Sequence, residues 1–173
     1  NIGTFTNPAT QVDQVQFGDV DKDGSLDVVV GWGGSTNTSN EICVYSLRGN
    51  VVEELRTERS YSEMIVTDLD ADGYEEIFTA SVTTPDQPAS ANLYRVRGSA
   101  IETVGVADLD VEVTSYLSVS AGMINEDQYG ILLDGVKSAG TISAYVTELV
   151  YWDSAQQRLA VPFYDPGTGT ANY

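Results

Sequence analysis

Carboxylates alternate with other residues in Asp19-Val20-Asp21-Lys22-Asp23-Gly24-Ser25-Leu26-Asp27, at positions 1, 3, 5 and 9, with glycine at position 6. Alternate residues of a tight loop can point their oxygens inward, and a hard cation such as Ca²⁺ binds six to eight oxygens at about 2.3–2.6 Å. Gly24 permits the positive φ that such a loop needs. We therefore predict a calcium site whose ligands are the carboxylates of Asp19, Asp21, Asp23 and Asp27 and the backbone carbonyl of Ser25.

The pattern recurs 49 positions later, in Asp68-Leu69-Asp70-Ala71-Asp72-Gly73-Tyr74-Glu75-Glu76. The predicted ligands of this second calcium ion are Asp68, Asp70, Asp72, Tyr74 (through its carbonyl) and Glu76. The alternative is an acidic β-turn, because Asp-Gly pairs commonly form hairpins. Four clustered carboxylates would repel one another without a cation, and this favours the metal site.

The residues after each loop distinguish these sites from EF-hands. An EF-hand has Glu at position 12 and a helix on either side, whereas position 12 here is Val30 in one copy and Thr79 in the other. The segments 27–32 and 76–81 are short and rich in strand-forming residues. Each acidic loop is therefore expected to join one strand to the next.

Composition predicts one all-β domain. The chain has 173 residues, enough for a sizeable core, and it is rich in Val, Thr, Tyr and Ile, with little helical periodicity. A formal net charge of −18 argues against nucleic acid or an anionic membrane surface as partner. No apolar run is long enough to span a bilayer, so we expect no membrane insertion. Cys43 is the single cysteine and is expected to be a buried, inert thiol.

Three pairs of landmarks show an internal repeat: Asp19 and Asp68, Tyr45 and Tyr94, and Gly49 and Gly98 are each 49 positions apart. Such a period is typical of arrays and propellers, and it predicts a duplicated four-stranded unit. The strands are expected at 11–20, 26–32, 41–47 and 51–56 in the first unit, and at 62–67, 77–82, 92–96 and 100–106 in the second.

A third unit is eroded. Its strands are expected at 119–122, 131–134, 141–152 and 158–163, with a loop at 135–140 and a turn at 153–157. Gly122, Ile124 and Glu126 stand where metal ligands would be, so no calcium is expected there. Residues 107–112 resemble the start of another metal loop but lack its glycine, and we interpret them as an acidic connection between units.

Phe17-Gly18 leading into residues 19–24, and Thr67 leading into residues 68–73, resemble the FG-GAP/VCBS repeats that form β-propeller blades, including those of the integrin α-subunit head. The resemblance implies three four-stranded antiparallel blades, at about 11–57, 61–107 and 114–163, followed by an exit segment at 164–173. It also implies a calcium loop between the first two strands of a blade. The second copy departs from the pattern: it lacks Phe-Gly, and it has Glu76 where Asp is usual.

Three blades would form only a partial propeller. Closed propellers typically have about four to eight blades, and open strand edges invite pairing with another chain. We favour the interpretation that the sequence is a fragment of a longer protein. The alternative is self-association through the open edges, which would make each chain half of a six-bladed assembly.

The sequence contains no histidine, which removes the commonest general base and every Ser-His-Asp or Cys-His arrangement. We predict no catalytic residues and expect a calcium-stabilised module for binding a protein or glycan ligand, for adhesion or for scaffolding. A carboxylate-based glycosidase or lyase stays open. The main alternative is the propeller part of a secreted polysaccharide-degrading enzyme, a lyase or glycoside hydrolase, with catalytic residues outside this chain; a structural spacer is a third possibility.

Calcium loops of modest affinity fill readily outside cells, so an extracellular, secreted or cell-surface location is expected. Chain reversal at each connection places the acidic loops and the turns at 48–50 and 97–99 on one face. The loops at 33–40, 83–91 and 135–140 then share the opposite face, where we expect the ligand. Trp32 is expected in the core, with a ligand contact as the alternative.

Overall fold

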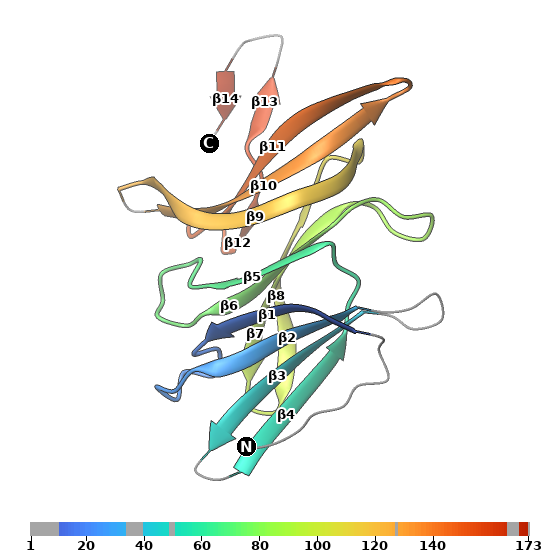
Figure 1. Cartoon of the computed structure of the whole chain (residues 1–173). Helices are drawn as coiled ribbons and strands as arrows, with labels where there is room; N and C mark the ends of the chain where they lie inside the picture. Colours follow the sequence, from blue (N-terminus) through green and yellow to red (C-terminus); the bar gives the residue numbers. More distant parts are fainter. Residues whose placement is uncertain (1–10, 34–39, 49–50, 127, 166–169, 173) are drawn as a thin grey trace.

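The computed structural model describes residues 11–33, 40–48, 51–126, 128–165 and 170–172. Every regular element in these residues is a β-strand, which confirms the all-β class. Three four-stranded antiparallel sheets stack on one another, from the N-terminal sheet at the bottom of Figure 1 to the C-terminal sheet near the top. The described part of the chain has no helix with the length and apolar character needed to cross a membrane.

The first and second sheets are copies of one arrangement. The first contains β1 (Gln11–Gly18), β2 (Asp27–Gly33), β3 (Glu41–Arg48) and β4 (Val51–Glu58) in chain order. The second contains β5 (Glu63–Thr67), β6 (Glu76–Ser81), β7 (Ser90–Arg97) and β8 (Ala100–Asp108) in the same order. Val28 pairs with Tyr45 in one and Ile77 with Tyr94 in the other, again 49 positions apart. The predicted duplication therefore extends to the strand register.

The third sheet contains β9 (Val113–Asn125), β10 (Gln128–Ala139), β11 (Ile142–Asp153) and β12 (Arg158–Ala160). The predicted loop at 135–140 is wrong, because residues 135–139 belong to β10, which pairs with β11 as far as Ala139 and leaves only Gly140 and position 141 as a tight turn. Gly135 suggested a loop, but it marks a close approach: a Cβ there would lie 2.9 Å from the backbone oxygen of Ser115 in β9.

Two further boundaries of the third unit differ from the prediction. β9 begins six residues before the expected position 119, because its N-terminal part pairs with the extended end of β10. The expected last strand, 158–163, ends at Ala160. Phe163, expected as the end of that strand, instead begins a separate two-stranded antiparallel sheet of β13 (Phe163–Asp165) and β14 (Thr170–Asn172), whose other described residues lie in the predicted exit segment.

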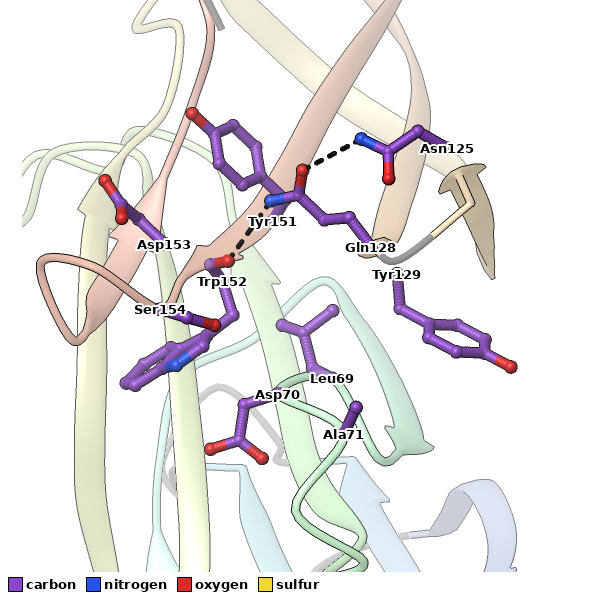
Figure 2. A pocket seen from close by; sticks show the side chains of 10 residues that line it. All are labelled: Leu69, Asp70, Ala71, Asn125, Gln128, Tyr129, Tyr151, Trp152, Asp153 and Ser154. Atoms are coloured by element: carbon purple, nitrogen blue, oxygen red, sulfur yellow. Dashed lines mark hydrogen bonds between the residues drawn. The ribbon is translucent and has the colours of Figure 1, made fainter.

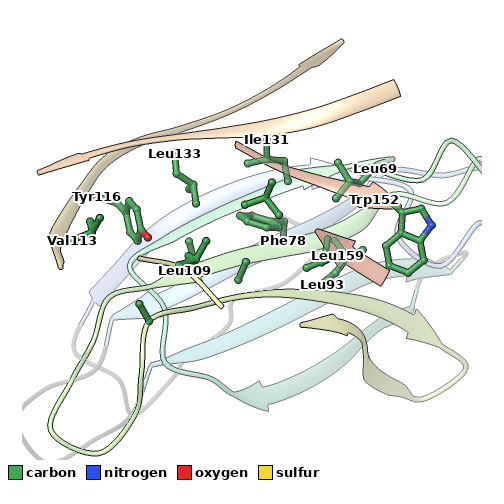
Figure 3. Packing of buried hydrophobic residues seen from close by; sticks show 14 residues of the cluster. Leu69, Phe78, Leu93, Leu109, Val113, Tyr116, Ile131, Leu133, Trp152 and Leu159 are labelled. Carbon is green, nitrogen blue, oxygen red and sulfur yellow. The ribbon is translucent and has the colours of Figure 1, made fainter. Parts of the chain in front are cut away.

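The second sheet is covered on both faces. Ile77 and Phe78 are adjacent in β6, so their side chains point to opposite faces: Ile77 joins the cluster shared with the first sheet, and Phe78 the cluster shared with the third. Figure 3 shows this second cluster, in which Phe78 and Leu93 face Ile131 and Leu133. Because both faces of β6 are covered, all of its residues except the last are buried, and buried and exposed positions do not alternate along it.

The sheets stack in matching order. β1 contacts β5 and β5 contacts β9, while β4 contacts β8 and β8 contacts β12. Gly18, the last residue of β1, allows the first two sheets to approach closely, because a Cβ there would lie 2.5 Å from Cγ1 of Val66 and 2.6 Å from Oε2 of Glu75. In the Phe-Gly pair before the first acidic loop, the glycine therefore allows the two sheets to pack closely.

Cys43 is buried, as predicted. It lies in a small cluster with Val30 and Tyr45, and the partly buried Trp32 packs against this cluster. Trp32 thus packs against the core, as expected, with its side chain partly buried, and its alternative role as a ligand contact stays a prediction.

Candidate metal centre

The first acidic loop joins β1 to β2, and its carboxylates organise its own backbone. Asp19 accepts hydrogen bonds from the amides of Asp23 and Gly24, both at 2.9 Å. Asp21 accepts from the amide of Asp23 at 3.1 Å. The chain can turn this tightly because Lys22 and Gly24 have φ of 59° and 86°.

The second loop joins β5 to β6 with the same geometry. Asp68 accepts from the amides of Asp72 and Gly73 at 3.1 and 3.0 Å. The two residues with positive φ are again at loop positions 4 and 6, at Ala71 with 59° and Gly73 with 82°. The spacing of carboxylates and glycine thus leads to one backbone conformation in both copies.

Each loop brings three carboxylates together. Asp19, Asp21 and Asp27 each offer an oxygen within 4.8 Å of the others, and so do Asp68, Asp70 and Glu76. Two oxygens on opposite sides of an ion bound at about 2.4 Å would be about 4.8 Å apart. Each triad could therefore hold a hard cation.

The other four predicted ligands lie outside these triads. The carboxylates of Asp23 and Asp72 accept hydrogen bonds from the amides of Ser25 and Tyr74, both at 2.8 Å. Ser25 and Tyr74 were expected to act through their backbone carbonyls, which stays a prediction.

The carboxylate at loop position 9 is the buried ligand in both copies. Asp27 is 1% exposed and accepts a hydrogen bond from the amide of Val20 at 3.0 Å. Glu76 is 0% exposed and accepts a hydrogen bond from the amide of Leu69 at 3.0 Å. Glu76 therefore fills the place of the usual Asp. Burial raises the pKa of Asp27, and burial raises the pKa of Glu76 to about 7. A bound cation would favour the ionised form of each.

Sequence reasoning missed Arg95, which β7 directs into the second triad. Its guanidinium donates to Glu76 and Asp70, with Nη2 distances of 2.6 and 3.0 Å. One signal could have revealed it. The register that pairs Ile77 with Tyr94 places Arg95 across from Glu76, and cross-strand neighbours of opposite charge interact. The same register places Ser46 across from Asp27.

The two acidic loops touch each other. The amide of Asp19 donates to Oε2 of Glu75 at 2.6 Å, and Nζ of Lys22 donates to the carbonyl of Asp72 at 3.1 Å. The same ammonium lies 3.9 Å from the centre of the Tyr74 ring. An ion in the first loop would therefore bind at a contact between two sheets.

The predicted common face is confirmed for the second unit. Asp21, Tyr74 and Arg95 line one pocket together with Arg97 and Gly98, which belong to the β7–β8 turn. In the first unit, residues 49 and 50 of the corresponding turn lie outside the described part of the chain.

A groove runs between the second acidic loop and the third sheet (Figure 2). It includes a pocket of about 430 Å³ and a neighbouring one of about 420 Å³ that share Asp70, Trp152 and Ser154. The remaining residues that line the first pocket are Leu69, Ala71, Asn125, Gln128, Tyr129, Tyr151 and Asp153. The groove is on the face of the acidic loops, whereas the sequence favoured the opposite face for a ligand.

Two of the three loops expected on the opposite face provide little support for a ligand site there. Residues 34–39 lie outside the described residues, and residues 135–139 belong to β10. The connection between β6 and β7 remains, across residues 82–89. Whether a ligand binds on that face stays a prediction.

In the third unit, β9 ends at Asn125 and β10 begins at Gln128, so the connection is too short for a nine-residue acidic loop. Gly122 and Ile124 are strand residues of β9. Residues 109–112, between β8 and β9, form the predicted acidic connection, in which Asp110 pairs with Lys137 of β10.

Comparisons with protein-family models and with curated protein sequences found no match to this chain. The fold and the site therefore define a class: an all-β chain of three four-stranded antiparallel sheets, with two acidic triads that could hold a metal ion.

Proposed function

We propose that this chain is a calcium-stabilised β-propeller module of the FG-GAP/VCBS type, which binds a ligand or serves as a scaffold and is itself non-catalytic. The observation that carries the proposal is the convergence of Asp19, Asp21 and Asp27 at the end of an Asp-Gly loop. An oxygen-only site with several carboxylates suits Ca²⁺, whereas Mg²⁺ demands octahedral geometry and retains its water.

The strand order supports a propeller. First strands lie beside first strands and fourth beside fourth, as blades do around an axis, and each acidic loop joins the first two strands of its sheet. The third sheet also exposes apolar side chains on the face that points away from the second sheet, including Leu132 at 42% and Tyr145 at 85%. Further blades of a longer protein, or a second copy in a six-bladed assembly, would cover them.

The groove favours a glycan as ligand. Tyr129 offers an aromatic ring, while Asn125, Gln128 and Asp153 offer hydrogen-bonding groups. A few directed polar groups beside aromatic surface are typical of small-molecule sites. With a formal net charge of −18, the chain would favour a neutral glycan over an acidic one. We place the module outside the cell or on its surface, where calcium is abundant.

The same groove is compatible with the alternative function, the propeller part of a secreted polysaccharide-degrading enzyme whose catalytic residues lie outside this chain. A glycan array followed by product analysis separates the two. Binding without cleavage by the longest natural chain that contains these sheets supports the module, and cleavage supports the enzyme. Tyr129→Ala should weaken binding in either case, because Tyr129 lines the groove and is 40% exposed, and unchanged binding would move the ligand away from the groove.

Thermal unfolding tests the calcium proposal directly. Calcium should raise the melting temperature of the chelated protein, and magnesium should do so much less. If the melting curves in chelator and in calcium coincide, the calcium-stabilised module is rejected.

A further inference from the structure

We infer that the second acidic loop carries its own cation, the guanidinium of Arg95, and takes no divalent ion. The inference deepens the proposed function and rests on it for the first loop, where Ser46 stands in the equivalent place. Both triads bring three carboxylate oxygens together, but in the second the guanidinium already lies among them, and in this arrangement no place is left for a metal ion.

Arg95 lies where the ion would lie. Its Nη2 atom is 2.6 Å from Glu76, 3.0 Å from Asp70 and 3.2 Å from Asp72, which are three of the four carboxylates predicted to bind calcium. Nε is also 3.1 Å from Oε1 of Glu76. Nη2 of Arg95 therefore contacts three carboxylates at once, as a metal ion would.

The guanidinium is held firmly. The Arg95 side chain is 12% exposed, Asp70 is 12% exposed and Glu76 is 0% exposed. The ring of Tyr74 lies 5.3 Å from the guanidinium carbon, within the range of a cation–π contact. Arginine stays charged at any ordinary pH and its donors form a rigid fork. A calcium ion would have to displace this group from the three carboxylates that it contacts.

The internal repeat isolates the cause. Both loops have the same carboxylate spacing and the same pair of positive φ angles. Ser46 and Arg95 occupy the same register position, one step from the pairs Val28–Tyr45 and Ile77–Tyr94. Ser46 is 6% exposed, and its short neutral side chain cannot reach across the loop as arginine does. At this position the first loop has a side chain that leaves its triad open, and the second has one that fills its triad.

A built-in cation gives the second loop a fixed shape at any calcium concentration. The first loop contacts it through the bonds from Asp19 to Glu75 and from Lys22 to Asp72. Calcium dependence is then confined to the first loop, which closes against a second loop that is already formed.

The test is the number of calcium ions bound per chain, measured by equilibrium dialysis and calorimetry on the intact chain. We expect one ion for the wild type, two for Arg95→Ser and one for the double variant Arg95→Ser/Asp70→Asn. Ser46→Arg should bind none, because it brings the guanidinium into the first loop. Arg97→Ser is the matched control: this arginine is 58% exposed in its side chain, pairs with Glu102, and should leave the number at one.

Two results would overturn the inference: Arg95→Ser binding no more ions than the wild type, or a wild type that binds two ions and loses one with Asp70→Asn. If Arg95→Ser does not fold, two single variants of the wild-type chain provide the test. Asp21→Asn should remove the bound ion, and Asp70→Asn should leave it bound. A wild type that binds no ion, with Arg95→Ser binding one, would reject the calcium proposal for the first loop and support the role of Arg95.

Discussion

The carboxylate of Glu75 accepts a hydrogen bond from the backbone amide of Asp19, with an N···O distance of 2.6 Å. Asp19 is the first predicted ligand of the first acidic loop, and Glu75 belongs to the second loop. The bond therefore crosses the interface between the first and second sheets. Calcium in the first loop should stabilise the packing of two sheets as well as one hairpin.

Glu75→Ala should weaken calcium binding to the first loop and lower the free energy of unfolding by about 1–3 kcal/mol, because the amide of Asp19 loses a charged acceptor. Glu102→Ala, at a carboxylate that is 49% exposed in β8, is the control and should have little effect. Calcium titration and denaturant unfolding measure the two quantities. Equal calcium affinity in wild type and Glu75→Ala would show that the contact is incidental.

Asp21→Asn should remove the calcium-induced rise in melting temperature. An ion at 100 times its dissociation constant stabilises the folded state by about 2.7 kcal/mol, and the variant should lose an increment of this kind. Asp70→Ala should instead lower the melting temperature equally in calcium and in chelator, because its partner is Arg95. A calcium-dependent loss in Asp70→Ala would contradict this division of roles.

The pH dependence of the unfolding free energy should report the protonation of Glu76. Burial raises its pKa to about 7 in the folded state, above the value of about 4.3 expected when unfolded. The unfolded state therefore releases this proton first, so the contribution of Glu76 is full below pH 4.3 and is lost as pH rises to about 7. In chelator, the unfolding free energy of the wild type should fall relative to Glu76→Gln across this window, by at most about 4 kcal/mol. A constant difference between the two proteins would refute the shift.

Gly18→Ala should destabilise the packing of the first two sheets by about 1–3 kcal/mol, because the added methyl group would overlap Val66 and Glu75. Gly122→Ala is the matched control in β9, where a Cβ meets no atom within 4 Å. Denaturant midpoints at fixed calcium concentration measure both changes. Equal midpoints would mean that the two sheets separate slightly at little cost.

Local patterns predicted the elements well where each residue's role depends on its neighbours in sequence. The carboxylate spacing and Gly24 led to the observed loop, because its hydrogen bonds join residues two to five positions apart. The repeat of 49 predicted the second sheet from the first. The third unit was less predictable: Gly135 resembles a loop signal, and only the partner strands β9 and β11 keep that segment extended.

The sequence by itself determined the all-β class, the duplicated four-stranded unit and the conformation of the two acidic loops, because these follow from short-range spacing. Only the tertiary structure decided that Arg95, 19 positions after Glu76, enters the second loop, and that Glu75 reaches Asp19 in another sheet. Those contacts depend on strand register and sheet stacking, which bring together residues distant in the chain. The physical difference between the two loops, a guanidinium across from Glu76 and a hydroxyl across from Asp27, arises there.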